Sequence, residues 1–232
     1  MSPKMKSEQL TALPPPNSRS ARMYRSLATL DRAAAQAGRT AVFVSRLLDL
    51  VLSLALLCIF SLPMLLIALL VKCTSQGPSI YRQQRSGLHG RPFVMFKFRT
   101  MPVDAESQSG PVWSKRGDPR CTRLGSFLRR YSLDELPQLF NVLLGDMSLV
   151  GPRPERPYFV QEFLQTVPHY GERLEVLPGI TGWAQINGWR GDSSLEKRLE
   201  CDLYYIKNWS LLFNLRILLA TPLRVLVEQH VC

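Results

Sequence analysis

The stretch "LVLSLALLCIFSLPMLLIALLV", residues 50–71, decides the fold, because it contains no charged residue. As an α-helix rising about 1.5 Å per residue it would be about 33 Å long, close to the roughly 30 Å hydrocarbon core of a bilayer. A single membrane-spanning helix is the simplest interpretation of this segment.

The centre of this segment favours a different path through the membrane. Ser61-Leu62-Pro63 lies near its midpoint, where proline removes a backbone donor and divides the helix into arms of about 16 Å each. The tail before the segment is basic, and the part after it carries Lys72 and several arginines. The positive-inside tendency would keep both flanks in the cytoplasm. We therefore expect a re-entrant membrane helix over residues 41–72, with a break near Ser61 and Pro63.

The charge of the chain indicates anionic partners. Its 232 residues carry a formal net charge of +11 at pH 7, which suits an anionic membrane surface, a phosphate-bearing substrate or nucleic acid. Residues 1–40 are rich in Lys, Arg, Pro and Ser, so a disordered basic tail is expected there, with a short helix near residues 28–36. The apolar run begins too late for a secretory signal peptide.

The five cysteines point to a reducing compartment. They are scattered and form no CxxC pair, so the sequence indicates neither a zinc site nor a secreted disulfide framework.

Residues 73–232 have the pattern of a mostly helical α+β domain. The runs "PSIYRQQ" and "PFVMFKFRT" flank "RSGLHGR", which predicts a β-hairpin. Helices are expected over residues 122–130, 135–144, 155–167, 193–206 and 208–220. The last of these mix aromatic, leucine and basic residues, so they could be amphipathic helices at the membrane interface or core helices of the domain, and both alternatives stay open.

Asp134 and Glu135 form an adjacent pair of carboxylates with two structural explanations. Ser132 and Glu135 match a capping box, but Pro137 would then fall inside the helix, at a cost of about 3 kcal/mol. If Asp134 is the N-cap instead, Pro137 falls in the first turn, where it is tolerated. We therefore expect Asp134 at a helix N-terminus.

The same position also suits chemistry. A carboxylate held ionised there could attack phosphorus if cations neutralise the phosphate oxygens. Candidate cations nearby are Lys97, Arg99, Arg129, Arg130, Arg153 and Arg156. Paired carboxylates are also hard oxygen ligands that suit Mg²⁺. The spacing alone makes phosphoryl transfer one hypothesis beside the capping role.

Four long motifs, in order, resemble those of the bacterial sugar transferase family. They are "KFRTM" at 97–101, "SLDELPQLFNVL" at 132–143, "GDMSLVGPRP" at 145–154 and "PGITGWAQINGWRGD" at 178–192. The resemblance covers the chain from about residue 41 to its end. The members in question are monotopic phosphoglycosyl transferases, short form, that begin capsule, exopolysaccharide and O-antigen synthesis.

The resemblance implies a reaction. Asp134 would attack the sugar-bearing phosphate of a UDP-sugar, releasing UMP and leaving a phosphosugar on the aspartate. Polyprenyl (undecaprenyl) phosphate would then accept the phosphosugar. Glu135 would assist with the metal or with protons, and Mg²⁺ would bind near Asp134. The enzyme would lie in the bacterial inner membrane with its catalytic domain facing the cytoplasm.

The resemblance also assigns binding residues. Arg153 matches the arginine of the Pro-Arg-Pro motif and Lys97 the lysine of the Lys-Phe-Arg-Thr-Met motif, and both are expected to bind phosphate. Arg99 and Arg130 are candidates for the same role. Arg190 is expected to contact the nucleotide or sugar, and the segment around it is similar to transferases of the neutral hexoses glucose and galactose.

The basic tail of residues 1–40 has no counterpart in the family, and the chain departs from the family pattern in two further places. Leu62 separates Ser61 from Pro63, which many relatives have adjacent, and Asn214 stands where many relatives have aspartate.

Other function classes fit less well. The basic residues are dispersed and show no nucleic-acid motif, so no nucleic-acid partner is expected. The histidines show no metal or triad spacing, and no G-x-S-x-G element occurs. A non-catalytic, membrane-anchored binding or scaffold protein is the remaining alternative, and a homodimer stays open.

Overall fold

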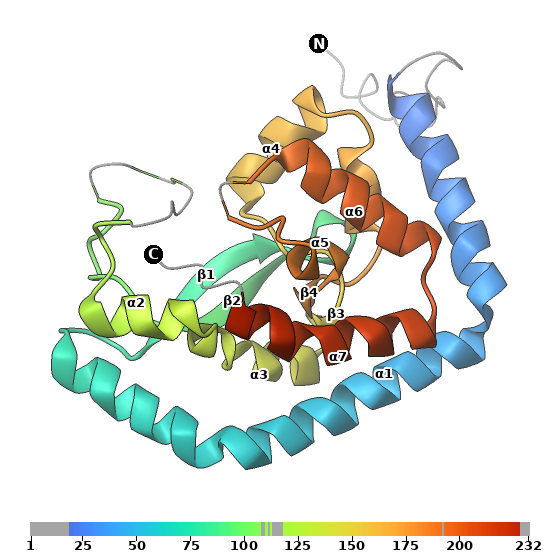
Figure 1. The fold of residues 1–232 in the computed structure, drawn as a ribbon. Helices are drawn as coiled ribbons and strands as arrows, with labels where there is room; N and C mark the ends of the chain where they lie inside the picture. The colour runs from blue at the N-terminus through green and yellow to red at the C-terminus, as the bar shows by residue number, and fades with distance from the viewer. Residues whose placement is uncertain (1–18, 108–109, 111, 113–117, 192, 228–232) are drawn as a thin grey trace, which may run out of the picture.

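A computed structural model describes residues 19–107, 110, 112, 118–191 and 193–227, with side chains from Gly38 to Val225. The elements follow in the order α1 (Arg19–Thr74), β1 (Ile80–Ser86), η2 (Leu88–Gly90), β2 (Pro92–Phe98), α2 (Arg123–Arg130), η3 (Leu133–Glu135), α3 (Gln138–Leu144), β3 (Ser148–Val150), α4 (Pro157–Thr166), η4 (Tyr170–Leu174), β4 (Gly179–Thr181), α5 (Trp183–Ile186), α6 (Leu195–Lys207) and α7 (Leu211–Val227). The predicted fold class, mostly helical α+β, is confirmed (Figure 1).

Helix α1 consists of two helical pieces joined at Gly38, whose φ of 72° is left-handed. The basic residues before this kink are helical from Arg19. The short helix expected near residues 28–36 is present but forms part of a longer helix, so disorder was wrongly expected at residues 19–27, while residues 1–18 lie outside the described part. The sequence missed this extension because its polar composition carries little apolar periodicity.

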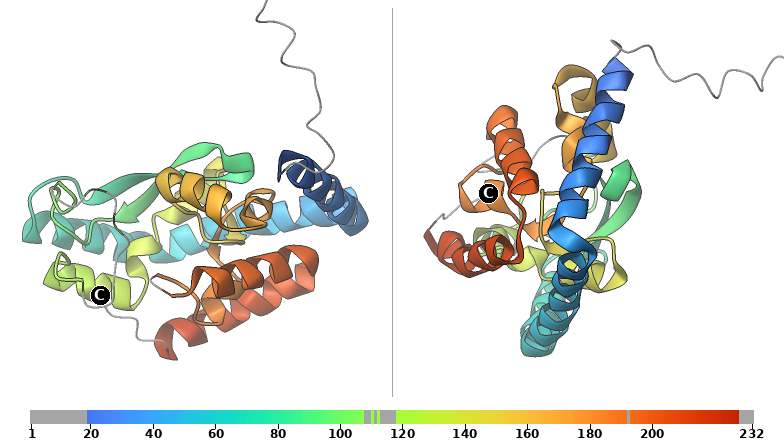
Figure 2. Two further views of the ribbon diagram at one scale, coloured as in Figure 1. Left: turned by 90° about the horizontal axis from the view of Figure 1, so that it is seen from above. Right: turned by 90° about the vertical axis from the view of Figure 1, so that its right-hand side faces the viewer.

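The piece Gly38–Thr74 is long and apolar enough to enter a membrane, with a mean hydropathy of 2.9 in its most apolar window, of which 11% is buried. It bends near its middle, and both ends rise toward the rest of the chain (Figure 1). The right-hand view of Figure 2 shows this bend projecting beyond the other elements. The shape fits the expected re-entrant helix.

The expected break at Ser61 and Pro63 is, however, a bend inside a continuous helix. Pro63 cannot donate to the carbonyl one turn earlier, and the Ser61 hydroxyl donates to the Cys58 carbonyl at 2.8 Å. The neighbouring backbone keeps helical geometry, so the proline bends the helix without ending it.

The predicted β-hairpin is confirmed. Strands β1 and β2 pair antiparallel with Ile80 opposite Phe98 and Ser86 opposite Pro92. Helix α3 is fixed to this hairpin by Asn141, whose Oδ1 accepts from Phe96 N at 3.0 Å and whose Nδ2 donates to Val94 O at 2.7 Å. This contact places the start of α3 beside the Lys97 end of β2.

A second sheet was not predicted. Strands β3 and β4 pair in parallel, with Ser148 opposite Gly179 and Val150 opposite Thr181. A Cβ on Gly179 would lie 2.1 Å from Gly151 N, so the two backbones approach each other at a distance that only glycine allows. The sheet orients the Pro-Arg-Pro segment that follows β3.

The last helix resolves the two alternatives left open for it, because α7 has two apolar faces. Ile217 is fully buried in the main core cluster. Leu212, Leu215, Leu219 and Leu223 recur at helical spacing on the other face and are between 50% and 76% exposed. The helix therefore packs in the core and also presents a leucine stripe that suits a membrane interface.

Candidate active site

Asp134 does not cap a helix. It lies in the short helix η3, after Ser132, which has a left-handed φ of 55° and makes no capping hydrogen bond. The N-cap position of α3 belongs to Pro137. Neither predicted capping hydrogen bond is therefore present, although Asp134 does lie in the first turn of a helix, as expected. The physical reason is that η3 runs directly into α3 through backbone bonds such as Leu139 N to Leu136 O, at 3.1 Å.

Asp134 is instead a buried wall residue of a large cavity. Its exposed fraction is 6%, and it lines an open cavity of about 950 Å³. Within the described part of the chain no hydrogen bond or ion pair reaches its carboxylate. Burial raises the pKa of Asp134, and the charge of Lys97 opposes this shift. The carboxylate is thus held without a partner at the edge of a polar chamber.

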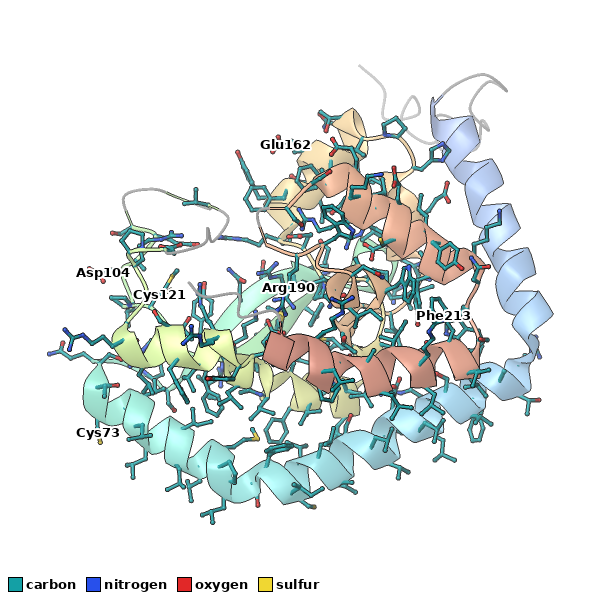
Figure 3. All side chains as sticks on the ribbon, in the orientation of Figure 1. Cys73, Asp104, Cys121, Glu162, Arg190 and Phe213 are labelled. Carbon is teal, nitrogen blue, oxygen red and sulfur yellow. The ribbon has the colours of Figure 1, made fainter. Side chains whose placement is uncertain are left out.

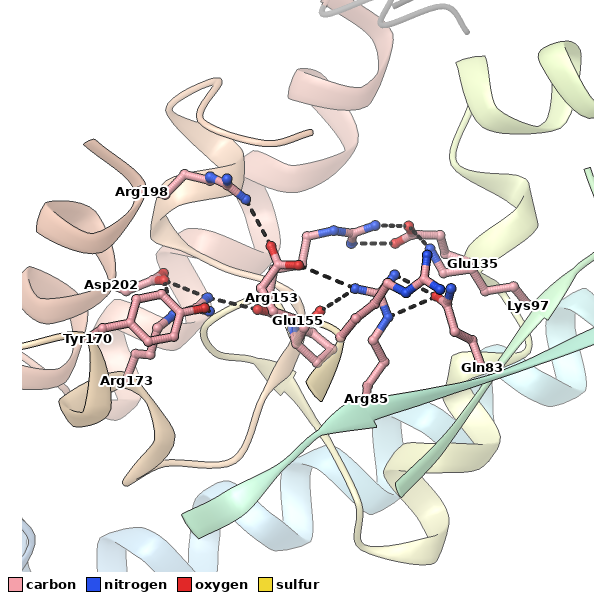
Figure 4. Close-up of polar contacts among 12 residues, drawn as sticks. Gln83, Arg85, Lys97, Glu135, Arg153, Glu155, Tyr170, Arg173, Arg198 and Asp202 are labelled. Carbon is pink, nitrogen blue, oxygen red and sulfur yellow. Dashed lines mark hydrogen bonds and ion pairs between the residues drawn. The ribbon is translucent and has the colours of Figure 1, made fainter. Parts of the chain in front are cut away.

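Glu135 lies in the opposite environment. Lys97 Nζ donates to Glu135 Oε1 at 2.9 Å, Arg153 Nη1 donates to Oε2 at 3.0 Å, and Arg153 Nη2 also contacts Oε1 (Figure 4). Burial alone would raise the pKa of Glu135, but the charges of Arg153 and Lys97 outweigh burial and hold the pKa well below its usual range. Glu135 is therefore ionised and neutralised by two cations.

The segment that carries Arg153 is held in place at its backbone. Arg173 Nη2 donates to the Arg153 carbonyl at 2.8 Å and also pairs with Asp202 at 2.9 Å. Arg85 Nη1 donates to the Pro154 carbonyl at 3.0 Å (Figure 4). These contacts come from β1 and η4, so two elements distant in sequence aim Arg153 at Glu135.

Sequence reasoning missed a second buried ion cluster around Glu155. This carboxylate accepts from Arg198 Nη1 at 2.9 Å and lies 3.5 Å from Arg85 Nη1. Burial lowers the pKa of Arg85 to about 10 despite the opposing charge of Glu155. The only sequence signal for this cluster was the position of Glu155 directly after the Pro-Arg-Pro motif.

The predicted phosphate-binding residues are distributed unevenly. Lys97, Arg99, Arg153 and Arg190 line the cavity. The Arg99 guanidinium, however, donates to Ser75 O and Oγ at 2.8 Å each, at the end of α1. Arg130 does not line the cavity, whereas Arg129 does. Substrate contacts by any of these residues stay predictions.

The acidic residues of the site suit a magnesium ion only if other groups complete its coordination. No group of three or more His, Cys, Asp or Glu side chains that could hold a metal occurs in the described ranges. Glu135 is engaged by two cations, which leaves Asp134 as the available carboxylate. Mg²⁺ is commonly held by one or two carboxylates together with substrate phosphates and water, so the site fits a metal that binds with a phosphorylated substrate.

The chain is similar to known proteins over most of its length. The profile of the family described as "Bacterial sugar transferase" matches residues 40–228. A Xanthomonas campestris pv. campestris protein named "UDP-glucose:undecaprenyl-phosphate glucose-1-phosphate transferase" is 49% identical over 72% of this chain and 35% of its own length. An Escherichia coli (strain K12) protein of the same name is 46% identical over 80% of this chain and 42% of its own length. The chain thus spans about two fifths of these relatives.

A shorter relative is matched almost throughout. The Bacillus subtilis (strain 168) protein named "Uncharacterized sugar transferase EpsL" is 43% identical over 82% of this chain and 91% of its own length. The family profile covers most of the chain and includes every element from the apolar part of α1 to α7. The chain therefore belongs to the bacterial sugar transferase family.

Proposed function

We propose that the protein transfers a hexose 1-phosphate from a UDP-sugar to polyprenyl (undecaprenyl) phosphate and releases UMP. The observation that carries the proposal is the environment of Asp134, an unpaired buried carboxylate on a cavity wall that it shares with Lys97, Arg129 and Arg153. The names of the relatives support the same reaction class.

The first step is displacement at phosphorus by Asp134. A carboxylate oxygen forms a bond to the sugar-bearing phosphorus of the UDP-sugar, and the bond from that phosphorus to the bridging oxygen breaks. UMP leaves with the electron pair, and an acyl phosphate to the sugar remains on Asp134. The cations on the wall suit the charge that develops on the phosphate oxygens.

The second step reverses the chemistry with a new acceptor. An oxygen of the lipid phosphate attacks the same phosphorus, and the Asp134 carboxylate leaves. Because the attacking phosphate already carries negative charge, no side chain has to remove a proton from it. The products are polyprenyl diphosphate sugar and the free enzyme.

Glu135 acts in this proposal by holding cations. Its carboxylate is bound by both Lys97 and Arg153, so it fixes these two positive groups at the cavity wall. Its depressed pKa makes it a poor proton donor near neutral pH. We therefore assign Glu135 a positioning role, in place of the metal or proton role expected from the family resemblance.

Mg²⁺ is the cofactor we propose, with Asp134 as its protein ligand and the substrate diphosphate supplying further oxygens. When bound, it would neutralise charge on the diphosphate and on the departing UMP.

The membrane arrangement follows from the exposed apolar faces. The outer side of α1 and the leucine stripe of α7 are both exposed, and the chain is strongly basic. We infer that the protein lies in the bacterial inner membrane, against anionic lipid, with the cavity on the cytoplasmic side. Glucose is the first candidate sugar because it appears in the names of several relatives, and N-acetylgalactosamine, which two others carry in their names, is the second.

UMP release from a panel of UDP-sugars, with polyprenyl phosphate and Mg²⁺, tests the proposal. Asp134→Asn keeps the shape of the side chain and removes the nucleophile. Asp104→Asn is the matched control, because Asp104 is exposed and outside the cavity wall. The expected result is release by wild type and the control, and loss of release in Asp134→Asn. Equal release by all three proteins would mean that another residue is the nucleophile, and no release by any of them would return the chain to the scaffold alternative.

A further inference from the structure

The cavity wall has a polar part and an apolar part, and the apolar part lies near the segment that leaves α1. Arg190, Arg198 and Glu155 make one part of the wall polar. Another part is apolar and comprises Pro78, Ile80, Met101, Pro102 and Val103, here called the α1-side rim. Figure 3 shows Arg190 well separated from Cys73, which lies near the end of α1.

The α1-side rim is attached to the end of α1. A Cβ on Gly77 would lie 2.7 Å from Val103 Cγ2, so Val103 packs directly on the chain that leaves the helix. Arg99, which precedes the rim, donates to Ser75 O at 2.8 Å. The rim is therefore held where the membrane helix joins the catalytic domain.

The rim also exposes apolar surface at this junction. Val103 is 72% exposed although it borders a cavity lined by arginines. On the arm of α1 that leads to the rim, Leu65, Leu66, Leu69 and Leu70 are all more than half exposed. The membrane helix and the rim thus both expose apolar surface near this junction, which suits an amphiphile with a buried tail and a phosphate head.

A cation lies beside the rim on the cavity wall that Asp134 shares. Arg129 lines the cavity, and its Nε donates to Thr100 Oγ1 at 2.8 Å, directly beside Met101. Its positive charge also lowers the pKa of Asp134, although burial is the larger influence. A phosphate that enters at the rim would therefore find Arg129 on the same cavity wall as Asp134.

We propose that the α1-side rim is the entry for the acceptor lipid. The first prenyl unit would lie on Val103 and its neighbours, and the phosphate would pass Arg129 to reach Asp134. The UDP-sugar would occupy the polar wall near Arg190 and Arg198. This inference rests on the proposed function and adds the place where the second substrate binds.

The kinetic test separates the two substrates. Val103→Asn makes the rim polar without adding charge, and Val94→Asn is the matched control, because Val94 is 41% exposed on β2 outside the cavity wall. The expected result for Val103→Asn is about a tenfold rise in the acceptor concentration needed for half-maximal rate. Single-turnover UMP release without acceptor should stay unchanged. Equal acceptor dependence in the two variants, or slower UMP release in Val103→Asn alone, would overturn the inference.

A binding test works without turnover. A short prenyl phosphate that carries a diazirine on its first prenyl unit is photolysed with the full chain in nanodiscs. Labelling of the peptide that contains Val103, competed by unlabelled prenyl phosphate, supports the rim. Labelling confined to other peptides, or no competed labelling at all, overturns it. UMP release by wild type without acceptor reports separately on the proposed function, so the two can fail independently.

Discussion

Arg153 donates hydrogen bonds to both carboxylate oxygens of Glu135, next to an Asp134 that has no such partner in the described part of the chain. Two adjacent acidic residues therefore have opposite electrostatic environments. Glu135 is ionised and immobilised, while burial makes ionisation of Asp134 costly. Such divergence between neighbouring carboxyl groups is a common sign that they have different roles.

The first prediction concerns the stability of Asp134→Asn. A carboxyl with a raised pKa holds its proton more tightly in the folded chain than in the unfolded chain. It lowers stability as the pH rises from its ordinary pKa through the raised value. Removing it should raise the free energy of unfolding at pH 7 by on the order of 1 kcal/mol, or about 2–4 °C in Tm. Thermal unfolding in detergent measures this change in stability. An unchanged or lower Tm in Asp134→Asn would contradict a destabilising effect of the buried Asp134 carboxylate.

The second prediction concerns the pH dependence of the first step. Because attack requires ionised Asp134 and burial raises its pKa, single-turnover UMP release should fall on acidification with a midpoint above 3.8, the ordinary value for aspartate. Rapid-quench assays across a buffered pH series give the midpoint. A rate that stays constant down to pH 4 in folded protein would contradict the assignment.

The third prediction concerns Glu135→Gln, which would leave Lys97 and Arg153 without their shared anion. Removing one member of a buried ion cluster leaves uncompensated charge, so we expect a loss of about 2–4 kcal/mol in the free energy of unfolding at pH 7. The folded pKa of Glu135 is depressed. Its stabilisation is therefore present above the ordinary pKa of 4.5 and is lost only as the pH falls through the lower folded value.

Urea unfolding at pH 7 and at progressively lower pH checks the Glu135 prediction. The gap between wild type and Glu135→Gln should persist at pH 5. A gap that closes between pH 7 and pH 5 would contradict the depressed pKa of Glu135. Glu162→Gln on α4 is a suitable control, since Glu162 is exposed and lies outside the cavity wall.

The fourth prediction concerns Glu106, whose two oxygens accept from Arg156 at 2.8 and 3.0 Å. Both residues line the cavity, so Glu106 competes with substrate phosphate for the guanidinium. Glu106→Gln should lower the KM for the UDP-sugar a few-fold with kcat little changed. A higher KM in steady-state assays would mean that the Glu106–Arg156 pair helps to build the binding site.

Local patterns in the sequence predicted local structure well. The apolar run of α1 and the turn between β1 and β2 are encoded by neighbouring residues, so composition and spacing were sufficient. The start of the α1 helix at Arg19 was missed because polar residues give no periodic signal. The three-residue strands β3 and β4 were missed because each is too short to show alternation and they pair across a long stretch of chain.

The acidic pair at the centre of the candidate site was predictable from the sequence, and the residues that surround it were less so. The family motifs contain four of the site residues, Asp134, Glu135, Lys97 and Arg153. In the structure, Lys97 and Arg153 both contact Glu135. Glu155 pairs with Arg198 from a distant segment, and the spacing of the two residues in the sequence does not indicate that they pair. The capping role assigned to Asp134 failed because the short helix η3 was not expected between Ser132 and Pro137.

The most direct test of the central claim is the mass of the peptide that contains Asp134 after reaction without acceptor. Full-length wild type and Asp134→Asn are incubated with UDP-glucose and Mg²⁺, quenched in acid, digested and analysed by mass spectrometry. The account predicts a hexose-phosphate adduct on Asp134 in wild type that disappears when polyprenyl phosphate is added, and no adduct in the variant. UMP release by wild type with no adduct, or with an adduct on another residue, would contradict it.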